Sequence, residues 1–179
     1  MIKSQSICPI CGHEADTQYF AFPKLPLGSK FEHLNGLVHI TCLKLHPNVI
    51  EIQTELKNIY LQIFENNHDF PIVASDGYIL IKSRPDNELL EVYDFEDFVE
   101  FYIPYNQINN ILELKREGQL EIGANRWTKI IVKKNGMIAI EYYHSKKNID
   151  IVNLSNLNID RLHEIVLCAR LIASKLGHV

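Results

Sequence analysis

Two stretches decide how the first part of this chain folds: Cys8-Pro9-Ile10-Cys11-Gly12 and Gly36-Leu37-Val38-His39-Ile40-Thr41-Cys42. Each contains a pair of metal-ligating residue types separated by two residues, Cys8 with Cys11 and His39 with Cys42. Three thiolates and one imidazole complete a tetrahedral ligand set for Zn²⁺ and leave no position for water. The spacing therefore predicts one structural zinc ion held by Cys8, Cys11, His39 and Cys42.

The choice of histidine is the open point in this ligand set. His13 follows the first pair and His46 follows the second, so either could take the place of His39. His39 is the preferred ligand, and its spacing from Cys42 suits the first turn of a helix. A closed site of this kind holds structure and offers no activated water for catalysis. Cys168 lies in an amphipathic helical pattern and is expected to be a buried, inert thiol.

Residues 1–47, through Cys8, Cys11, His39 and Cys42, resemble a treble-clef zinc finger, in which a C-x-x-C knuckle and a second pair at a helix start hold the metal. The His-x-x-Cys pair is also similar to half of a LIM-type module. The resemblance implies a zinc-binding module, and a segment this short is expected to depend on its metal for folding. Treble-clef modules serve in nucleic-acid binding, in protein binding and as nuclease scaffolds, so the resemblance implies a structure more than a function.

The chain after this module divides into a linking helix and a larger β region. Apolar residues from Val49 to Ile63 recur at helical spacing and predict a helix over about 49–66, within a linker at 48–68. Beyond it the pattern alternates, which predicts strands at about 71–74, 78–83, 88–94, 98–103, 108–114, 128–134, 137–143 and 149–154. Apolar residues from Leu162 to Leu176 predict a C-terminal helix that Asp160 helps to start and Gly177 ends.

Turn signals indicate an antiparallel domain over residues 69–179. Asp76-Gly77 and Asn135-Gly136 are typical of two-residue hairpins, in which both central positions need a positive φ angle. The short strands, the segment from Phe101 to Ile111 and the closing helix are together similar to a pleckstrin-homology (PH) or GRAM-type domain. This similarity implies a PH-like barrel for residues 70–177, with an open sheet as the alternative. The predicted fold class is α+β: a treble-clef-like zinc module, a linking helix, and an antiparallel β domain closed by a C-terminal helix.

Composition and motifs narrow the class of protein. The 179 residues are 46% hydrophobic and 22% charged, which is typical of a folded globular chain. No apolar run approaches the roughly 18 residues of a membrane helix, so a cytoplasmic location is expected. The sequence has no Gly-rich phosphate loop, no Gly-x-Ser-x-Gly elbow and no His-Glu-x-x-His motif, so no catalytic residue is assigned and a non-enzymatic protein is expected. An enzyme with a cleft between the two domains is the remaining catalytic alternative.

Acidic residues cluster in one segment of the predicted β domain. Residues 86–100 contain no Lys or Arg and seven acids: Asp86, Glu88, Glu91, Asp94, Glu96, Asp97 and Glu100. An acidic surface can dock a basic protein surface. We therefore expect Asp94, Glu96 and Asp97 to contact a basic partner, and the protein to be a protein-interaction module of the adaptor, inhibitor or immunity type.

A basic segment supports the alternative function. Residues 115–147 carry eight basic residues against three acids. Basic side chains contact phosphates, and aromatic rings stack on bases. In this alternative the chain binds nucleic acid through Arg126, Trp127, Lys129, Lys133 and Lys134, with the zinc module as an additional contact. The net charge of −4 favours the protein-binding function.

Overall fold

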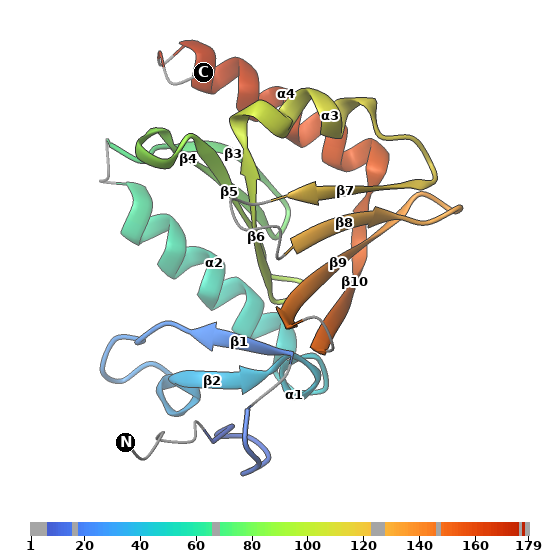
Figure 1. Ribbon diagram of the computed structural model, residues 1–179. Coiled ribbons are helices and arrows are strands. Elements are labelled where there is room, and N and C mark those ends of the chain that lie inside the picture. Colours follow the sequence, from blue (N-terminus) through green and yellow to red (C-terminus); the bar gives the residue numbers. More distant parts are fainter. Residues whose placement is uncertain are drawn as a thin grey trace.

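The computed structural model of the protein describes residues 7–15, 18–65, 69–122, 128–145, 148–175 and 177. The fold is α+β, as predicted, and its described strands form three antiparallel sheets (Figure 1). A two-stranded sheet lies in the N-terminal part, and two four-stranded sheets follow it along the chain. None of the described helices combines the length and the apolar character needed to cross a membrane.

The N-terminal part is a hairpin followed by two helices. Strands β1 (Tyr19–Phe22) and β2 (Gly36–His39) are antiparallel, and the loop between them contains the 3-10 turn η1 (Glu32–Leu34). Helix α1 (Ile40–Lys44) follows β2 directly. Helix α2 (Val49–Glu65) confirms the predicted linking helix, and its periodic face is buried at Ile52, Leu56 and Phe64.

The first four-stranded sheet is an antiparallel meander. Its strands, hydrogen-bonded in chain order, are β3 (Ile72–Asp76), β4 (Ile79–Arg84), β5 (Leu89–Asp94) and β6 (Val99–Pro104), and the turn η2 (Pro85–Asn87) joins β4 to β5. Helix α2 packs on this sheet, since the rings of Tyr60 and Tyr93 have centroids 5.0 Å apart. Figure 1 shows α2 along one side of the meander.

The second four-stranded sheet is also a meander. It consists of β7 (Gly118–Ile122), β8 (Thr128–Val132), β9 (Met137–Ser145) and β10 (Asn148–Asn158). The turn η3 (Tyr105–Gln107) and helix α3 (Ile108–Glu113) connect the two sheets. Helix α4 (Ile159–Lys175) ends the fold and packs against β3 and α3.

The predicted C-terminal helix is present, with two corrections. The side-chain oxygen of Asn158 accepts a hydrogen bond from the N–H of Arg161 at 2.9 Å, so Asn158 caps α4 in place of Asp160. Buried Leu162, Val166 and Ala169 confirm the apolar face of α4. Cys168 is exposed on this helix, so the prediction of a buried thiol is wrong.

The two large sheets remain separate among the described residues, and they form no closed barrel. The strand predicted at 108–114 is helix α3 instead. Its buried residues, Ile108 and Ile111, lie three positions apart, which places both on one face of a helix. This helix lies between β6 and β7 in the chain, and the strands that follow it form a sheet of their own. The sequence pattern did not predict β7.

Both predicted hairpins exist, but their turns differ from the predicted type. Gly77 and Tyr78 join β3 to β4, and Gly77 has a φ of 55°. In the turn from β8 to β9, Gly136 has a φ of 79° and its N–H bonds to the carbonyl of Lys133 at 2.8 Å. Asn135 does not share the positive φ. A type I turn with a left-handed glycine accounts for this second hairpin.

One continuous hydrophobic core connects the N-terminal part with the rest of the protein. Phe20 of β1 and Phe98, in the turn between β5 and β6, are both buried, with ring centroids 5.9 Å apart. The buried cluster that includes Cys8 also takes in α2, both large sheets and α4. The division into a zinc module (1–47), a linking helix (48–68) and a β domain (69–179) stays a prediction.

Candidate metal centre and an adjoining pocket

The first ligand pair lies in a tight knuckle. Ile7 and Glu14 form an antiparallel bridge, and the N–H of Cys8 bonds to the carbonyl of His13 at 2.8 Å. The N–H of Gly12 bonds to the carbonyl of Cys8 at 2.9 Å. Gly12 has a φ of 73°, in the left-handed region that favours glycine. The Cys-x-x-Cys-Gly sequence can therefore turn back on itself and bring its two thiols together.

The second ligand pair lies where β2 changes into α1. His39 is the last residue of β2, and Cys42 lies in the first turn of α1, as predicted. Nε2 of His39 lies 3.1 Å from the carbonyl oxygen of Glu14, so this nitrogen can donate its hydrogen to that carbonyl. Such a bond fixes the ring orientation and tautomer of a metal-binding histidine. Nδ1 is then left to face the thiols.

The four predicted ligands, Cys8, Cys11, His39 and Cys42, have their ligand atoms within 4.8 Å of one another. Nδ1 of His39 is 3.3 Å from Sγ of Cys11 and 4.0 Å from Sγ of Cys42. A tetrahedral zinc ion, with Zn–S of about 2.3 Å and Zn–N of about 2.0 Å, separates its ligand atoms by about 3.5–3.8 Å. The donor set and its spacing therefore fit such an ion, and this group could bind a metal.

The alternative histidines do not belong to this cluster. Nδ1 of His46 accepts a hydrogen bond from the N–H of Asn48 at 3.1 Å, and its ring packs edge-on against Phe31. His13 contributes its carbonyl to the knuckle. The preference for His39 agrees with the geometry.

The surroundings of the thiols act in opposite directions on their pKa values. Burial alone would raise the pKa of Cys8, but hydrogen bonds from the backbone of Cys11, His39 and Ile10 outweigh it and lower this pKa to about 6. Burial, together with Cys11 and Cys8, raises the pKa of Cys42 to about 11. A divalent cation would favour the thiolate form of every sulfur in the group.

The predicted acidic docking surface lies largely inside the protein. Asp94 is buried, and its Oδ1 accepts hydrogen bonds from the N–H groups of Glu96 at 3.0 Å and Asp97 at 3.2 Å. These bonds shape the turn between β5 and β6. Glu96 is half-buried, and its carbonyl accepts a bond from Gln53 at 3.1 Å. Asp97 is 0% exposed. Asp94 and Asp97 therefore do not lie on the surface where the sequence placed them.

Asp97 makes internal contacts instead. Its Oδ1 lies 2.5 Å from Nζ of Lys44 and accepts a hydrogen bond from the hydroxyl of Ser155 at 2.8 Å. Its Oδ2 accepts the N–H of Ser155 at 2.5 Å. The carboxylate thus joins α1, which carries Cys42, to the turn after β5 and to β10. The cation that Asp97 contacts is a lysine of the same chain.

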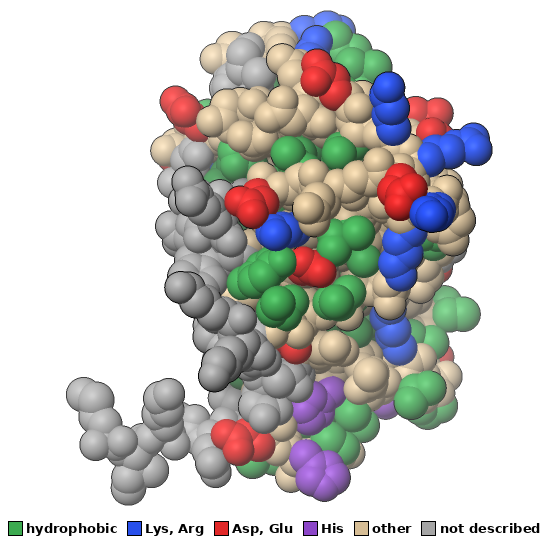
Figure 2. Space-filling model, turned by 45° about the vertical axis from the view of Figure 1, so that its right-hand side comes forward, with side chains coloured by type: hydrophobic (Ala, Val, Ile, Leu, Met, Phe, Trp, Pro, Cys, Tyr) green, Lys and Arg blue, Asp and Glu red, His purple; other side chains and the backbone are tan. Residues whose placement is uncertain are grey.

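The predicted nucleic-acid contacts are only partly within the described residues, since Arg126 and Trp127 lie outside them. Lys129 forms an ion pair with Glu121 at 3.4 Å, and Lys133 donates to the side-chain oxygen of Asn153 at 2.6 Å. Lys134 is exposed in the turn between β8 and β9. Figure 2 shows acidic and hydrophobic side chains interspersed with Lys and Arg on the face that includes the second sheet. The charges described there are mixed, whereas a phosphate backbone requires a positive surface.

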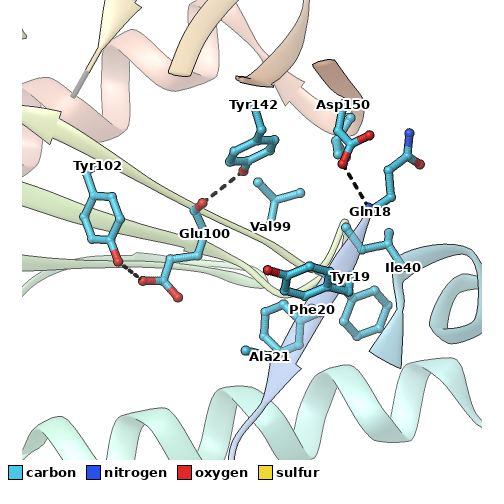
Figure 3. Close-up of a pocket in the computed structure, with 12 residues that line it drawn as sticks. Gln18, Tyr19, Phe20, Ala21, Ile40, Val99, Glu100, Tyr102, Tyr142 and Asp150 are labelled. Atoms are coloured by element: carbon cyan, nitrogen blue, oxygen red, sulfur yellow. Dashed lines mark hydrogen bonds between the residues drawn. The ribbon is translucent and has the colours of Figure 1, made fainter. Parts of the chain in front are cut away.

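A pocket beside β1 was not indicated by the sequence (Figure 3). It has a volume of about 260 Å³ and is partly open to solvent. Its walls come from the start of β1, from the start of β6, and from the ends of β9 and β10 that face them. The lining includes Tyr19, Phe20, Glu100, Tyr102, Tyr142 and Asp150. These residues lie far apart in the chain, so no local motif could have revealed the pocket.

Comparisons of the chain with protein-family models, with curated proteins and with solved structures found no match. The structure itself therefore defines the class of site: a Cys3His group that could hold a metal, next to a pocket rich in aromatic side chains.

Proposed function

We propose that the protein is a non-enzymatic protein-interaction module, of the adaptor, inhibitor or immunity type, whose treble-clef-like N-terminal part holds one structural zinc ion. The observation that carries this proposal is the Cys3His group, whose His39 ring is oriented by Glu14. Four protein ligands leave no coordination position for a substrate or for water. The ion would therefore hold the fold in place.

The metal group supports a neighbouring surface. The N–H of Ile40, which follows His39, bonds to the carbonyl of Gln18 at 2.8 Å. Gln18 leads into β1, and β1 forms one wall of the pocket. A metal bound by His39 would thus help to fix the position of this wall.

Exposed apolar side chains favour a protein partner. Tyr19 and Tyr102, which both line the pocket, are 40% and 41% exposed. Ile149 and Ile151 are exposed on β10. Large, rigid side chains at a surface contribute much of the binding energy in protein interfaces. The mixed charges around Lys129 do not favour nucleic acid over protein.

The first part of the test is metal analysis of purified protein by mass spectrometry. Wild-type protein should carry one zinc ion per chain, and Cys42→Ser should lose most of it. Cys168→Ser is the matched control, because this exposed thiol lies in α4, outside the ligand group. Stoichiometric zinc in Cys42→Ser would contradict the assigned ligand set.

The second part is capture of the partner from a lysate of the host organism with immobilised wild-type protein, before and after nuclease treatment. The proposed function predicts a stoichiometric protein that survives nuclease and that Cys42→Ser captures less well. Recovery of nucleic acid that disappears with nuclease or moderate salt would support the nucleic-acid alternative and overturn the proposed one.

A further inference from the structure

The pocket beside β1 has aromatic walls from separate strands. Tyr19 comes from β1, Tyr102 from β6 and Tyr142 from β9 (Figure 3). The hydroxyl of Tyr142 donates a hydrogen bond to the carbonyl of Glu100 at 2.9 Å, which ties its ring to β6. Because the faces of aromatic rings carry negative electrostatic potential, such walls attract a cation more than an anion.

Glu100 supplies a carboxylate to this pocket; the charge of Lys82 acts on this carboxylate, but Lys82 forms its ion pair with Glu91 instead. Among the described residues, Glu100 accepts a hydrogen bond from the hydroxyl of Tyr102 but forms no ion pair with Lys or Arg. Glu91 on the neighbouring strand differs, because it pairs with Lys82 at 2.7 Å and Arg84 at 2.8 Å. Burial raises the pKa of Glu100, so a cation that entered the pocket would stabilise its charged form.

The rest of the lining matches a cation attached to an apolar chain. Asp150 contributes a second carboxylate, which accepts the N–H of Gln18 at 3.1 Å. None of the described lining residues is Lys, Arg or His. Ala21, Val99 and Val152 supply aliphatic surface. Within the described part of the lining, an anionic ligand would find no side chain of opposite charge.

We propose that this pocket receives a lysine side chain of the partner protein, with the alkyl chain along the aromatic walls and the ammonium group near Glu100. This inference rests on the proposed function and specifies the chemistry that the partner presents. The volume of about 260 Å³ suits one long side chain, since sites for drug-sized ligands span about 300–1,000 Å³.

Two features favour lysine over arginine and over a free amine. One carboxylate oxygen of Glu100 already accepts the Tyr102 hydroxyl, so the two-pronged contact that a guanidinium prefers is hindered, whereas an ammonium needs only one oxygen. The half-exposed rings of Tyr19 and Tyr102 can cover residues on either side of an inserted side chain. A free amine would leave the exposed parts of these rings uncovered.

The inference is tested with three capped pentapeptides that differ only at the central residue, which is lysine, norleucine or arginine. Binding to the zinc-loaded, full-length protein is followed by NMR titration of ¹⁵N-labelled backbone amides. The lysine peptide should bind at least tenfold more tightly than the norleucine peptide, with shifts at β1 and β6. Equal affinity for lysine and norleucine, or tighter binding of arginine, would overturn the inference.

Substitutions of single residues test whether the lysine ammonium group contacts Glu100. Glu100→Gln should weaken binding of the lysine peptide at least tenfold, because it removes the charge and keeps the shape of the side chain. Glu121→Gln is the matched control, since Glu121 lies on β7 and pairs with Lys129 outside the pocket. Zinc content and the unfolding midpoint establish that each variant is folded. Unchanged affinity in a folded Glu100→Gln protein would contradict the role of this carboxylate.

Two further measurements complete the test. The first distinguishes a lysine side chain from a free amine, and the second distinguishes failure of the pocket inference from failure of the proposed function. n-Butylammonium should bind at least tenfold more weakly than the lysine peptide, and equal binding would assign the pocket to free amines instead. In lysate capture, Glu100→Gln should lose the partner that wild-type protein retains. Full retention by this variant overturns the pocket inference and leaves the proposed function standing, whereas a wild-type protein that captures no partner overturns the proposed function itself.

Discussion

Lys44, the last residue of α1, places its ammonium nitrogen 2.5 Å from Oδ1 of Asp97, whose side chain is fully buried. The pair connects the helix that carries Cys42 to the turn between β5 and β6. The same carboxylate accepts the N–H and the hydroxyl of Ser155. Asp97 is therefore a polar contact through which the part that carries the Cys3His group meets both large sheets.

Removal of this carboxylate should destabilise the whole protein. Asp97→Ala leaves the N–H of Ser155 and the ammonium of Lys44 without their acceptor. Because the Lys44 side chain is 32% exposed and can be solvated, the cost is that of the unsatisfied buried groups, about 1–3 kcal/mol. Urea unfolding monitored by circular dichroism measures this loss. Glu96→Gln, at the half-buried neighbouring position, should change stability by less than about 1 kcal/mol. Equal effects of the two substitutions would contradict the role assigned to Asp97.

A methyl group at Gly12 should strain the knuckle without a steric clash. A Cβ at this position meets nothing within 4 Å, but its φ of 73° costs an L-residue about 1–2 kcal/mol. We expect Gly12→Ala to release zinc to a colorimetric chelator several-fold faster than wild type. Gly28→Ala is the matched control, because Gly28 has a φ of 85° and equally open surroundings but lies outside the ligand pairs. Equal release from both variants would show that knuckle strain does not govern metal retention.

Metal removal should loosen the structure in a defined order. With a chelator present, hydrogen exchange should accelerate in the knuckle and in β1, β2 and α1, because the ligands would no longer hold them together. Hydrogen exchange in the turn at Phe98 should accelerate next, since the ring of Phe98 packs on Phe20. Amides of Ile130 and Ile140, buried in the second sheet, should keep their protection longest. Uniform acceleration over the chain, or none, would contradict this order.

Asp94 should make stability depend on pH. Burial, followed by the nearby charge of Asp97, raises the pKa of Asp94 from 3.8 to about 7. The folded protein therefore binds more protons than the unfolded chain between these values. The stability that Asp94 contributes is fully present below about pH 4 and is lost as the pH rises through about 7. Over this range the loss is on the order of 4 kcal/mol.

Comparison with Asp94→Asn isolates this effect. Asparagine retains an oxygen that can accept the N–H groups of Glu96 and Asp97 but does not titrate. The difference in unfolding free energy, wild type minus variant, should fall from pH 4 to pH 8. Metal binding also depends on pH, but it affects both proteins alike and cancels in the difference. Parallel stability curves for the two proteins would show that Asp94 keeps an ordinary pKa.

The sequence predicted those parts of the structure that depend on residues close together in the chain or on residue types with distinctive chemistry. Cys8, Cys11, His39 and Cys42 were identifiable because few residue types bind zinc and their spacing repeats. The helices at Val49–Glu65 and Ile159–Lys175 are long enough for apolar periodicity to be decisive. Helix α3, with six residues, is too short for apolar periodicity to be decisive, because over such a run Ile108 and Ile111 fit a strand as readily as a helix.

The features that sequence missed depend on contacts across long separations. The acids near Asp97 appear as a surface patch in the sequence, yet Lys44 and Ser155 lie 53 and 58 residues away from Asp97 in the chain. The pocket combines Tyr19, Glu100, Tyr142 and Asp150 from distant strands. Such sites become visible only once the sheets have been placed against each other.

The hydrogen bond from the N–H of Ile40 to the carbonyl of Gln18 joins the pocket wall to the residue that follows His39. If zinc holds β1 in the position that suits a ligand, the ligand must in turn strengthen zinc binding by the same factor, because such coupling is reciprocal. The protein would then respond to the cellular zinc supply through its affinity for its partner, and abundant partner would protect the metal from competing chelators.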